Sequence, residues 1–327
     1  MVQYHIMKKW KLFISITLFT AGLFVSCAST PGNKDGIGAD ASKAKIADEV
    51  VAAPEPTAEE LFIEKISDIN ISVTKNPSKT KKNKPFSSAY EFSVTDGNNE
   101  PVSDFPLTVK YPKEKDGPEI VYGEEQLYTD ENGTVSFDPP TPDFAASACL
   151  TASPAVPEGL DIPQQILDQH TAYGDYAVES DIATKGAIMF VLEYNENGKA
   201  PKDSYDILSG LRKKGIYNIG NAPRSDESYY NASKEKIYRD NFAEVGTSFG
   251  YLIGGTIKFT NPVEKNEDGT YTAKMTAYIY GIEMKSGKVI LEETRENTGT
   301  GANWNKAVES CRTILTAMVV DSIMFGL

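Results

Sequence analysis

The stretch GAIMFVLEYN, residues 186–195, decides the fold of the last third of the chain. A half-buried strand alternates apolar and polar side chains, whereas a strand covered on both faces is a continuous apolar run. This stretch is a run of the second kind, and such strands occur in sheets that have helices packed on them. It therefore predicts a buried strand at the start of an α/β domain.

Helical and strand patterns alternate downstream of this strand. A stripe of apolar residues predicts the first helix at 204–215, which stops at Gly215. The elements predicted after it are a strand at 216–220, a helix at 232–250, strands at 251–260, 271–284 and 288–297, and a helix at 303–325. The apolar face predicted for the last helix consists of Ala307, Cys311, Ile314, Leu315, Met318 and Val319. The order β-α-β-α-β-β-β-α predicts an α/β (α+β) domain with a mixed sheet and helices packed on it over residues 186–327.

Three stretches of this domain carry a resemblance. They are residues 250–257, the turn and strand at 285–290, and Gly299-x-Gly301 before the closing helix. Together they resemble the small α/β domain shared by the curli-secretion lipoprotein, the amino-terminal domain of TolB and the lipoprotein activators of penicillin-binding proteins. The resemblance implies a docking or assembly role in the cell envelope. The long amphipathic hairpins of a curli-type pore are not found in the sequence, so a channel is not predicted.

Two glycine pairs in this domain invite comparison with phosphate-binding loops. Gly299 and Gly301 precede a helix, but a Walker loop needs a Gly-Lys-Ser/Thr ending and a dinucleotide fingerprint needs a third glycine. The stretch is therefore predicted to be a turn that feeds the helix cap. The pair Gly254-Gly255 lies within a strand, where it predicts a bulge or the close approach of a helix.

The segment 61–157 predicts an all-β sandwich. Tyr90, Phe92 and Val94 alternate with more polar neighbours, and Asn132-Gly133 between two alternating runs predicts a β-hairpin. The residues that carry a resemblance here are Val94-x-Asp96, Pro101-Val102, Pro106-Leu107-x-Val109 and Thr129-Asp130-x-x-Gly133-x-Val135-x-Phe137. They resemble bacterial immunoglobulin-like (Ig-like) domains of the invasin type, and also carboxypeptidase regulatory-like domains. Either resemblance implies a spacer or a binding module.

The amino-terminal residues predict a lipoprotein signal peptide over 1–26. A short basic region precedes an apolar run at 12–26, which is shorter than the roughly 20 residues of a membrane-spanning helix. The sequence Val25-Ser26-Cys27 resembles a bacterial lipobox, although Phe24 stands where Leu is usual. The resemblance implies diacylglycerol and a third acyl chain, such as palmitate, on Cys27, which would anchor the chain to a membrane. A plain signal-anchor helix is the alternative.

The remaining segments and the charge bear on location and partners. Residues 27–60 predict a disordered tether and residues 158–185 a connector that includes one short helix at 163–169. Removal of residues 1–26 takes away three lysines and no acidic residue, so the formal charge changes from −13 to −16. A chain this acidic is not expected to bind nucleic acid. Ala28, where an inner-membrane retention signal usually has Asp, favours the outer membrane, facing the periplasm or the cell surface.

Catalytic and metal-binding patterns are weak. Beyond Cys27 the chain has two cysteines, Cys149 and Cys311, and either a disulfide or two separate buried thiols is compatible with the sequence. A catalytic pair of Cys149 and His170 lacks a third orienting group at a recognisable spacing. We therefore predict no catalytic residue, no cofactor and no metal site.

Two functions from different classes fit these features. The first is a lipid-anchored, non-enzymatic scaffold that binds an envelope protein and modulates cell-envelope assembly or peptidoglycan synthesis, with a homo-oligomer as a further option. The second is a surface-exposed lipoprotein that binds host or glycan ligands through the Ig-like domain.

Overall fold

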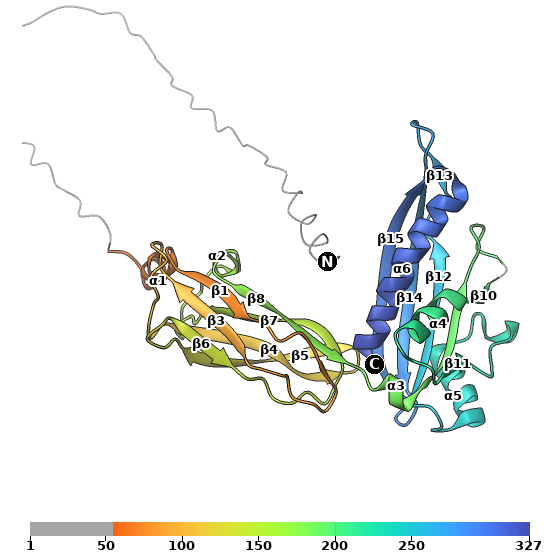
Figure 1. The fold of residues 1–327 in the computed structure, drawn as a ribbon, viewed down its shortest axis with the longest axis horizontal. Coiled ribbons are helices and arrows are strands. Elements are labelled where there is room, and N and C mark those ends of the chain that lie inside the picture. Colours follow the sequence, from red (N-terminus) through yellow and green to blue (C-terminus); the bar gives the residue numbers. More distant parts are fainter. Residues whose placement is uncertain (1–54, 200) are drawn as a thin grey trace, which may run out of the picture. The chain divides into compact units, whose positions relative to one another are not determined.

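The computed structural model describes residues 55–199 and 201–327, which form three sheets and the helices that accompany them (Figure 1). Two of the sheets form a β-sandwich and the third belongs to an α/β domain, so the predicted fold class is confirmed. The predicted signal peptide, Cys27 and most of the predicted tether lie outside the described residues. None of the helices within the described ranges combines the length and apolar character that crossing a membrane requires.

The sandwich is preceded by helix α1 (Ala58–Ile66), which begins inside the segment predicted as a tether. A capping box starts this helix, because the Thr57 hydroxyl accepts the Glu60 N–H and the Glu60 carboxylate accepts the Thr57 N–H. The elements that follow are β1 (Asn70–Lys75), β2 (Thr80–Lys81), β3 (Tyr90–Thr95), β4 (Pro106–Asp116), β5 (Glu119–Tyr128), β6 (Thr134–Phe137), β7 (Ala146–Pro154), α2 (Gln164–Gln169) and β8 (Ala172–Glu179). One sheet has the order β1-β3-β6 and the other has the order β2-β8-β7-β4-β5.

The core of the sandwich follows the alternation seen in the sequence. Tyr90, Phe92 and Val94 of β3 are fully buried, and their neighbours along the strand are only partly buried. Leu107 and Val109 of β4 meet them from the other sheet as members of one apolar core. The period of two thus places one side of each strand in the core.

The turn at Asn132-Gly133 is not a β-hairpin, so this prediction is wrong. The strands on either side of the turn belong to different sheets, because β5 pairs with β4 and β6 pairs with β3. The Asp130 carboxylate accepts the backbone N–H groups of Asn132 and Thr134, and Gly133 has a φ of 67°. The same turn residues therefore fold a crossover between sheets, which the local sequence does not distinguish from a hairpin.

The segment predicted as a connector contains a strand of the sandwich. Strand β8 pairs with β7 over most of its length, and Ala172, Tyr176 and Val178 belong to the sandwich core. The predicted short helix is present as α2, which ends at Gln169 and is followed by His170 as the capping residue. The alternation of buried and exposed residues in β8 includes Gly174, which weakens the sequence signal of a strand.

The α/β domain contains every predicted element, two additional short strands and two additional short helices. Its elements are α3 (Ile182–Lys185), β9 (Ala187–Glu193), β10 (Lys202–Asp203), α4 (Tyr205–Lys213), β11 (Ile219–Asn221), the 3-10 helix η3 (Glu227–Tyr229), α5 (Lys234–Val245), β12 (Tyr251–Phe259), β13 (Glu264–Lys265), β14 (Tyr271–Glu283), β15 (Val289–Gly301) and α6 (Trp304–Gly326). Strands β9, β12 and β14 are neighbours in this order, β10 and β11 flank β9, and β15 flanks β14. Strands β11 and β12 run parallel to β9, β14 is antiparallel to β12, and β15 is antiparallel to β14, so the sheet is mixed.

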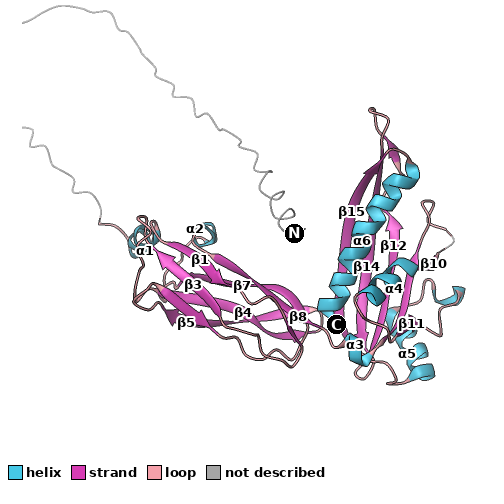
Figure 2. Ribbon diagram, viewed as in Figure 1, coloured by secondary structure: helices cyan, strands magenta, loops and turns pink. Residues whose placement is uncertain are grey.

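Helices cover both faces of this sheet (Figure 2). All seven residues of β9 are buried, as the opening stretch predicted. Ala187, Met189 and Val191 pack with residues of α4 and α6, whereas Ile188 and Phe190 pack with residues of α5. We call these two sides the α4/α6 face and the α5 face.

Glycines allow α6 to lie directly on β15. A Cβ atom on Gly299 would lie 2.2 Å from the backbone nitrogen of Cys311, and one on Gly301 would lie 2.4 Å from that of Ala307. Both glycines belong to β15 and not to a turn, which corrects the prediction. Their role is to remove side chains from a helix–strand contact.

The glycine pair within β12 has a different structural role from the one predicted. A Cβ atom on Gly254 would lie 2.1 Å from the Tyr280 ring on the neighbouring strand, and the pairing of β12 with β14 runs through both glycines without a register shift. The prediction of a bulge or a close helix is therefore wrong. The glycine makes room for an aromatic side chain that covers it from the adjacent strand.

The apolar face of α6 is rotated from the predicted one. Ala307, Cys311, Leu315 and Val319 are buried as predicted, but Ile314 is 49% exposed. The other buried side chains of the helix are those of Val308, Val320 and Ile323. The difference arises because α6 packs on the sheet and also beside α4, which buries residues on a second side of the helix.

Candidate functional site

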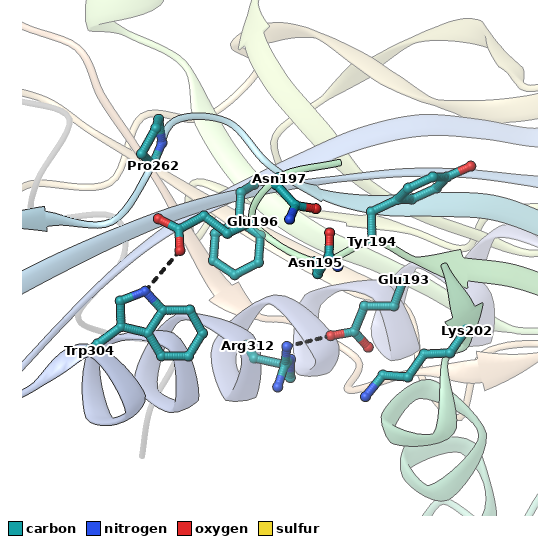
Figure 3. A pocket seen from close by; sticks show the side chains of 10 residues that line it. Glu193, Tyr194, Asn195, Glu196, Asn197, Lys202, Pro262, Trp304 and Arg312 are labelled. Carbon is teal, nitrogen blue, oxygen red and sulfur yellow. Dashed lines mark hydrogen bonds and ion pairs between the residues drawn. The ribbon is translucent and has the colours of Figure 1, made fainter. Parts of the chain in front are cut away.

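Two concavities lie on the α4/α6 face and share Trp304 and Arg312. The first, which we call the strand-end pocket, has a volume of about 670 Å³. Its lining residues are Glu193, Tyr194, Asn195, Glu196, Asn197, Lys202, Phe259, Pro262, Trp304 and Arg312 (Figure 3). The second, which we call the interhelical groove, has a volume of about 540 Å³. Its lining residues are Asp206, Ser209, Gly210, Lys213, Lys214, Trp304, Asn305, Val308, Glu309, Arg312, Thr313, Thr316, Ala317 and Val320.

The sheet topology creates the strand-end pocket. Strands β9 and β12 are parallel neighbours, and Glu193 at the end of β9 pairs with Ile257 near the end of β12. The chain leaves both strands at the same edge of the sheet, where the loops after them supply half of the lining residues. In open α/β sheets, ligands bind outside the carboxyl ends of parallel strands. The location is therefore one where a binding site is expected.

A buried ion pair forms the inner wall of this pocket. Glu193 continues the inward-facing series of Ala187, Met189 and Val191, so its side chain points toward α6 and is only 4% exposed. The Arg312 guanidinium lies 2.6 Å from its carboxylate (Figure 3). The two groups attract as charges without hydrogen-bond alignment, and Arg312 Nε is buried with no hydrogen-bond partner in the described part of the chain. A carboxylate buried this deeply is stable only with such a counter-charge.

The indole of Trp304 is fixed at the other side of the pocket. Its N–H donates to Glu196 Oε2 at 3.0 Å, and Glu196 Oε1 accepts the Val263 N–H at 2.6 Å. The indole also stacks on Phe259 with a centroid separation of 6.3 Å and an interplanar angle of 27°. Trp304 nevertheless remains 39% exposed. The result is an oriented and accessible aromatic surface.

The interhelical groove exists because α4 and α6 lie side by side. A Cβ atom on Gly210 would lie 2.7 Å from a methyl group of Val320, so the glycine allows the two helices to approach. Gly210 and Val320 line the groove together with other small and apolar residues, among them Val308 and Ala317. Several of the charged groups along the groove are already paired, as Lys214 is with Asp321 at 3.2 Å and Glu309 is with Lys306 at 2.7 Å.

The residues singled out from the sequence do not come together at this site. Cys149 lies in β7, opposite Asp175 of β8. His170 lies at the end of α2, and its Nδ1 atom is 2.8 Å from the carbonyl oxygen of Ile69. Cys311 is buried between α6 and the sheet. Both cysteines are free thiols, so the disulfide is not formed, and the prediction of separate buried thiols holds for Cys311 but not for Cys149, which is exposed. The lipidation site predicted at Cys27 lies outside the described residues.

Sequence reasoning missed Glu193, Arg312 and Trp304. Glu193 was detectable as a single acidic residue in an otherwise apolar strand, which is a signal of a buried charge with a partner. The identity of that partner depends on how α6 packs on the sheet, so the sequence could not supply it. No arrangement of His, Cys, Asp and Glu suited to a metal ion occurs within residues 55–199 and 201–327.

Comparison with known proteins gives one family match. Residues 186–324 match the model of the C-terminal domain of TP0693-like lipoproteins. A search of curated proteins found no match. The family match supports the prediction of a bacterial lipoprotein and assigns no activity to it.

Solved structures that resemble part of the chain come from several bacteria. The PelC dodecamer from Paraburkholderia phytofirmans is 19% identical, covers 42% of this chain and 85% of its own, and has a TM-score of 0.27. The hypothetical protein CT253 from Chlamydia trachomatis is 11% identical, covers 42% of this chain and 94% of its own, and has a TM-score of 0.31. Lipoprotein GNA1162 from Neisseria meningitidis is 12% identical, covers 41% of this chain and 94% of its own, and has a TM-score of 0.24. At these TM-scores the likenesses support no inference about the present chain.

Proposed function

We propose that the chain is a lipid-anchored, non-enzymatic protein of the bacterial envelope whose α/β domain binds a helix of a partner protein. The observation that carries this proposal is the interhelical groove between α4 and α6. An enzyme of envelope assembly, such as a peptidoglycan synthase, is the partner class that the sequence resemblance implies.

The shape and lining of the groove suit a helix. Two helices on one face of a sheet present parallel rows of side chains, and a third helix packs by placing its own row between them. The small residues Thr316 and Ala317 leave room for side chains of the partner. Trp304 is the first of the α6 residues that line the groove and Arg312 lies midway along them, and these residue types dominate the binding energy of many protein interfaces.

The lipid anchor at Cys27 is part of the same proposal. Two or more acyl chains hold a protein stably at a membrane, because each buried methylene contributes about 0.8 kcal/mol. The lipobox-like Val25-Ser26-Cys27 supports this assignment, and so does the family match to lipoproteins. Metabolic labelling with an alkyne analogue of palmitate is expected to mark the wild-type chain and not the Cys27→Ala variant.

The groove is tested by blocking it without disturbing the fold. Ala317 lines the groove and is exposed, so Ala317→Arg places a long charged side chain in the groove at little cost to stability. Ala243 is also exposed on a helix but lies on α5, which packs on the other face of the sheet, so Ala243→Arg is the matched control. Both variants would carry a carboxyl-terminal tag and be crosslinked in intact cells before capture.

The expected result is that an envelope-assembly enzyme is captured with the wild type and with Ala243→Arg, and at least about tenfold less with Ala317→Arg. Equal capture by the two arginine variants would place the partner elsewhere on the protein. If only further copies of the same chain are captured, the groove would be an interface of a homo-oligomer and not a site for a partner protein.

A second candidate function uses the sandwich. Tyr122 of β5 and Tyr173 of β8 are 40% and 57% exposed, and Lys110 Nζ lies 5.7 Å from the centroid of the Tyr122 ring. Exposed tyrosines on a sheet face can stack on host or glycan ligands. Loss of cell-surface ligand binding in a Tyr122→Ser/Tyr173→Ser variant, together with cleavage of the sandwich by protease added to whole cells, would favour this function.

A further inference from the structure

The indole of Trp304 offers a carbon face to a ligand in the strand-end pocket. Its N–H is engaged by Glu196 and its orientation is set by Phe259, so the polar edge of the ring is already used. What remains for a ligand is the part of the apolar ring surface that Phe259 does not cover, and Trp304 as a whole residue is 39% exposed. Such a surface binds a ring that presents C–H groups or another aromatic ring.

The charges that line this pocket cancel. Glu193 and Glu196 are acidic, and Lys202 and Arg312 are basic. Glu193 is already neutralised by Arg312, and Glu196 accepts two N–H groups. Such a pocket has no excess charge to balance that of a charged ligand, so burial of a charged ligand would cost free energy. The balance therefore favours an uncharged molecule over an anion or a cation.

The polar groups of the pocket suit a molecule with several hydroxyl groups. Asn195 and Asn197 stand at the wall, and the oxygens of both carboxamides face the Lys199 N–H, at 2.8 Å and 3.2 Å. Each carboxamide also carries an NH₂ group with two donors. The Arg312 side chain is 31% exposed, and its Nε has no hydrogen-bond partner within the described residues. Arg312 Nε is therefore a donor for which the described residues supply no acceptor.

We propose that the strand-end pocket binds a neutral saccharide of one or two rings. One pyranose ring stacks its C–H face on Trp304, and its hydroxyl groups bond to the carboxamides of Asn195 and Asn197 and to the guanidinium of Arg312. A volume of about 670 Å³ lies within the range of small-molecule sites and accommodates a disaccharide. This function is additional to partner binding in the interhelical groove and rests on different residues, apart from Trp304 and Arg312.

The fluorescence of Trp304 provides a direct test. The chain has two tryptophans, and Trp10 lies in the predicted signal peptide, so in a Trp10→Phe background Trp304 is the only indole. The full chain in detergent would be titrated with glucose, galactose, N-acetylglucosamine, maltose, lactose and N,N′-diacetylchitobiose. Sodium glucuronate and adenosine would serve as an anionic probe and an aromatic probe. We expect a saturable change in emission with at least one neutral sugar at a Kd between roughly 0.1 and 10 mM, and none with the other two probes.

Variants separate this site from its surroundings. Asn195→Ala/Asn197→Ala keeps the fluorescent reporter and is expected to weaken sugar binding by about tenfold or more. Asn231→Ala, at an exposed position outside the pocket, is the matched control and should bind as the wild type does. Ala317→Arg should also bind the sugar normally, because Ala317 lines only the interhelical groove.

Several results would overturn the proposal. They are the absence of a saturable response to every neutral sugar, a stronger response to glucuronate or adenosine, and unchanged sugar binding in the double asparagine variant with a native circular dichroism spectrum. Loss of sugar binding in Ala317→Arg would move the sugar to the interhelical groove and would contradict the assignment to the strand-end pocket. Partner capture in cells is measured separately, so failure of one proposal does not decide the other.

Discussion

The two faces of the α/β sheet are covered in different ways. On the α5 face, Tyr280 covers Gly254, and Tyr238 packs on Phe242 with a centroid separation of 5.5 Å. Its charged groups lie at the surface, as in the pair of Lys234 and Glu292 at 2.8 Å. On the α4/α6 face, two helices share the sheet and both concavities lie beside them. The α5 face therefore contributes mainly stability, whereas the α4/α6 face combines stability with the two proposed binding surfaces.

The polar chemistry of the two faces differs in the same sense. A carboxylate and a guanidinium are partly removed from water on the α4/α6 face, at Glu193 and Arg312. The α5 face buries the Tyr280 hydroxyl, which has no hydrogen-bond partner in the described ranges. A buried charge needs a counter-charge held in a fixed position, and a side chain held in this way can also serve in ligand recognition. The following four changes test this comparison.

The largest effect is expected where α6 touches β15. In Gly299→Ala the new Cβ atom would lie 2.2 Å from the backbone nitrogen of Cys311, so the helix must move. We expect a loss of about 3 kcal/mol in the free energy of unfolding. Urea unfolding followed by Trp304 fluorescence measures it. Gly220→Ala is the control, because no atom lies within 4 Å of its added Cβ, and a comparable loss there would remove the explanation by close packing.

The next effect concerns the buried ion pair. Arg312→Met leaves the Glu193 carboxylate buried without its counter-charge and should cost about 2–3 kcal/mol, less than the usual loss for a fully buried pair because Arg312 is 31% exposed. The double variant Glu193→Gln/Arg312→Met removes both charges and should recover at least half of this loss. Equal stability of the single and double variants in urea unfolding would show that the pair is not coupled.

Two buried tyrosines then compare the faces directly. The Tyr251 hydroxyl, in the core of the α4/α6 face, donates to Asp181, whereas the buried Tyr280 hydroxyl on the α5 face has no partner in the described part of the chain. Burial raises the pKa of both phenols well above the usual value, and the Asp181 carboxylate raises that of Tyr251 further. Tyr251→Phe should therefore cost about 1–2 kcal/mol, while Tyr280→Phe should be neutral or slightly stabilising. The reverse order of the two unfolding free energies would contradict these hydrogen-bond assignments.

The smallest effect is a pH dependence on the α5 face. The Lys236 ammonium, with Arg239 and Tyr229, lowers the pKa of Asp240 to about 2. The folded state thus holds this carboxylate ionised more strongly than the unfolded state, so its contribution is present above about pH 4 and is lost as the pH falls toward 2. Asp240→Asn should flatten this part of the curve of thermal midpoint against pH. Lys236→Met should do the same, and an unchanged slope in both variants would exclude the pair as its source.

Much of the α/β domain was predictable from local pattern. The apolar run of β9, the stripe of α4 and the succession of β12, β14 and β15 were all placed correctly, because each element carries its own periodicity. The errors concern contacts between elements. Gly254 and Gly299 read as a bulge and a turn, but the structure shows that each accommodates a group from another element.

The candidate site was less predictable than the fold. Glu193 precedes Trp304 and Arg312 by more than a hundred residues along the chain, and the sequence contains no motif that joins the three. The turn at Asn132-Gly133 shows the same limit within the sandwich, since the local residues specify a turn but not which strands it connects. In both cases the missing information is the pairing of distant segments.

The sequence by itself determined the fold class, the longer strands and helices of the α/β domain and the lipobox-like start, because these depend on composition and on periodicities of two or 3.6 residues. Only the tertiary structure decided which strands pair, which helix lies on which face, and that Glu193, Trp304 and Arg312 meet beside two concavities. The physical reason is that side-chain periodicity is a local property of the backbone. A binding site depends on distances between segments, which are set by how all the apolar faces are buried at once.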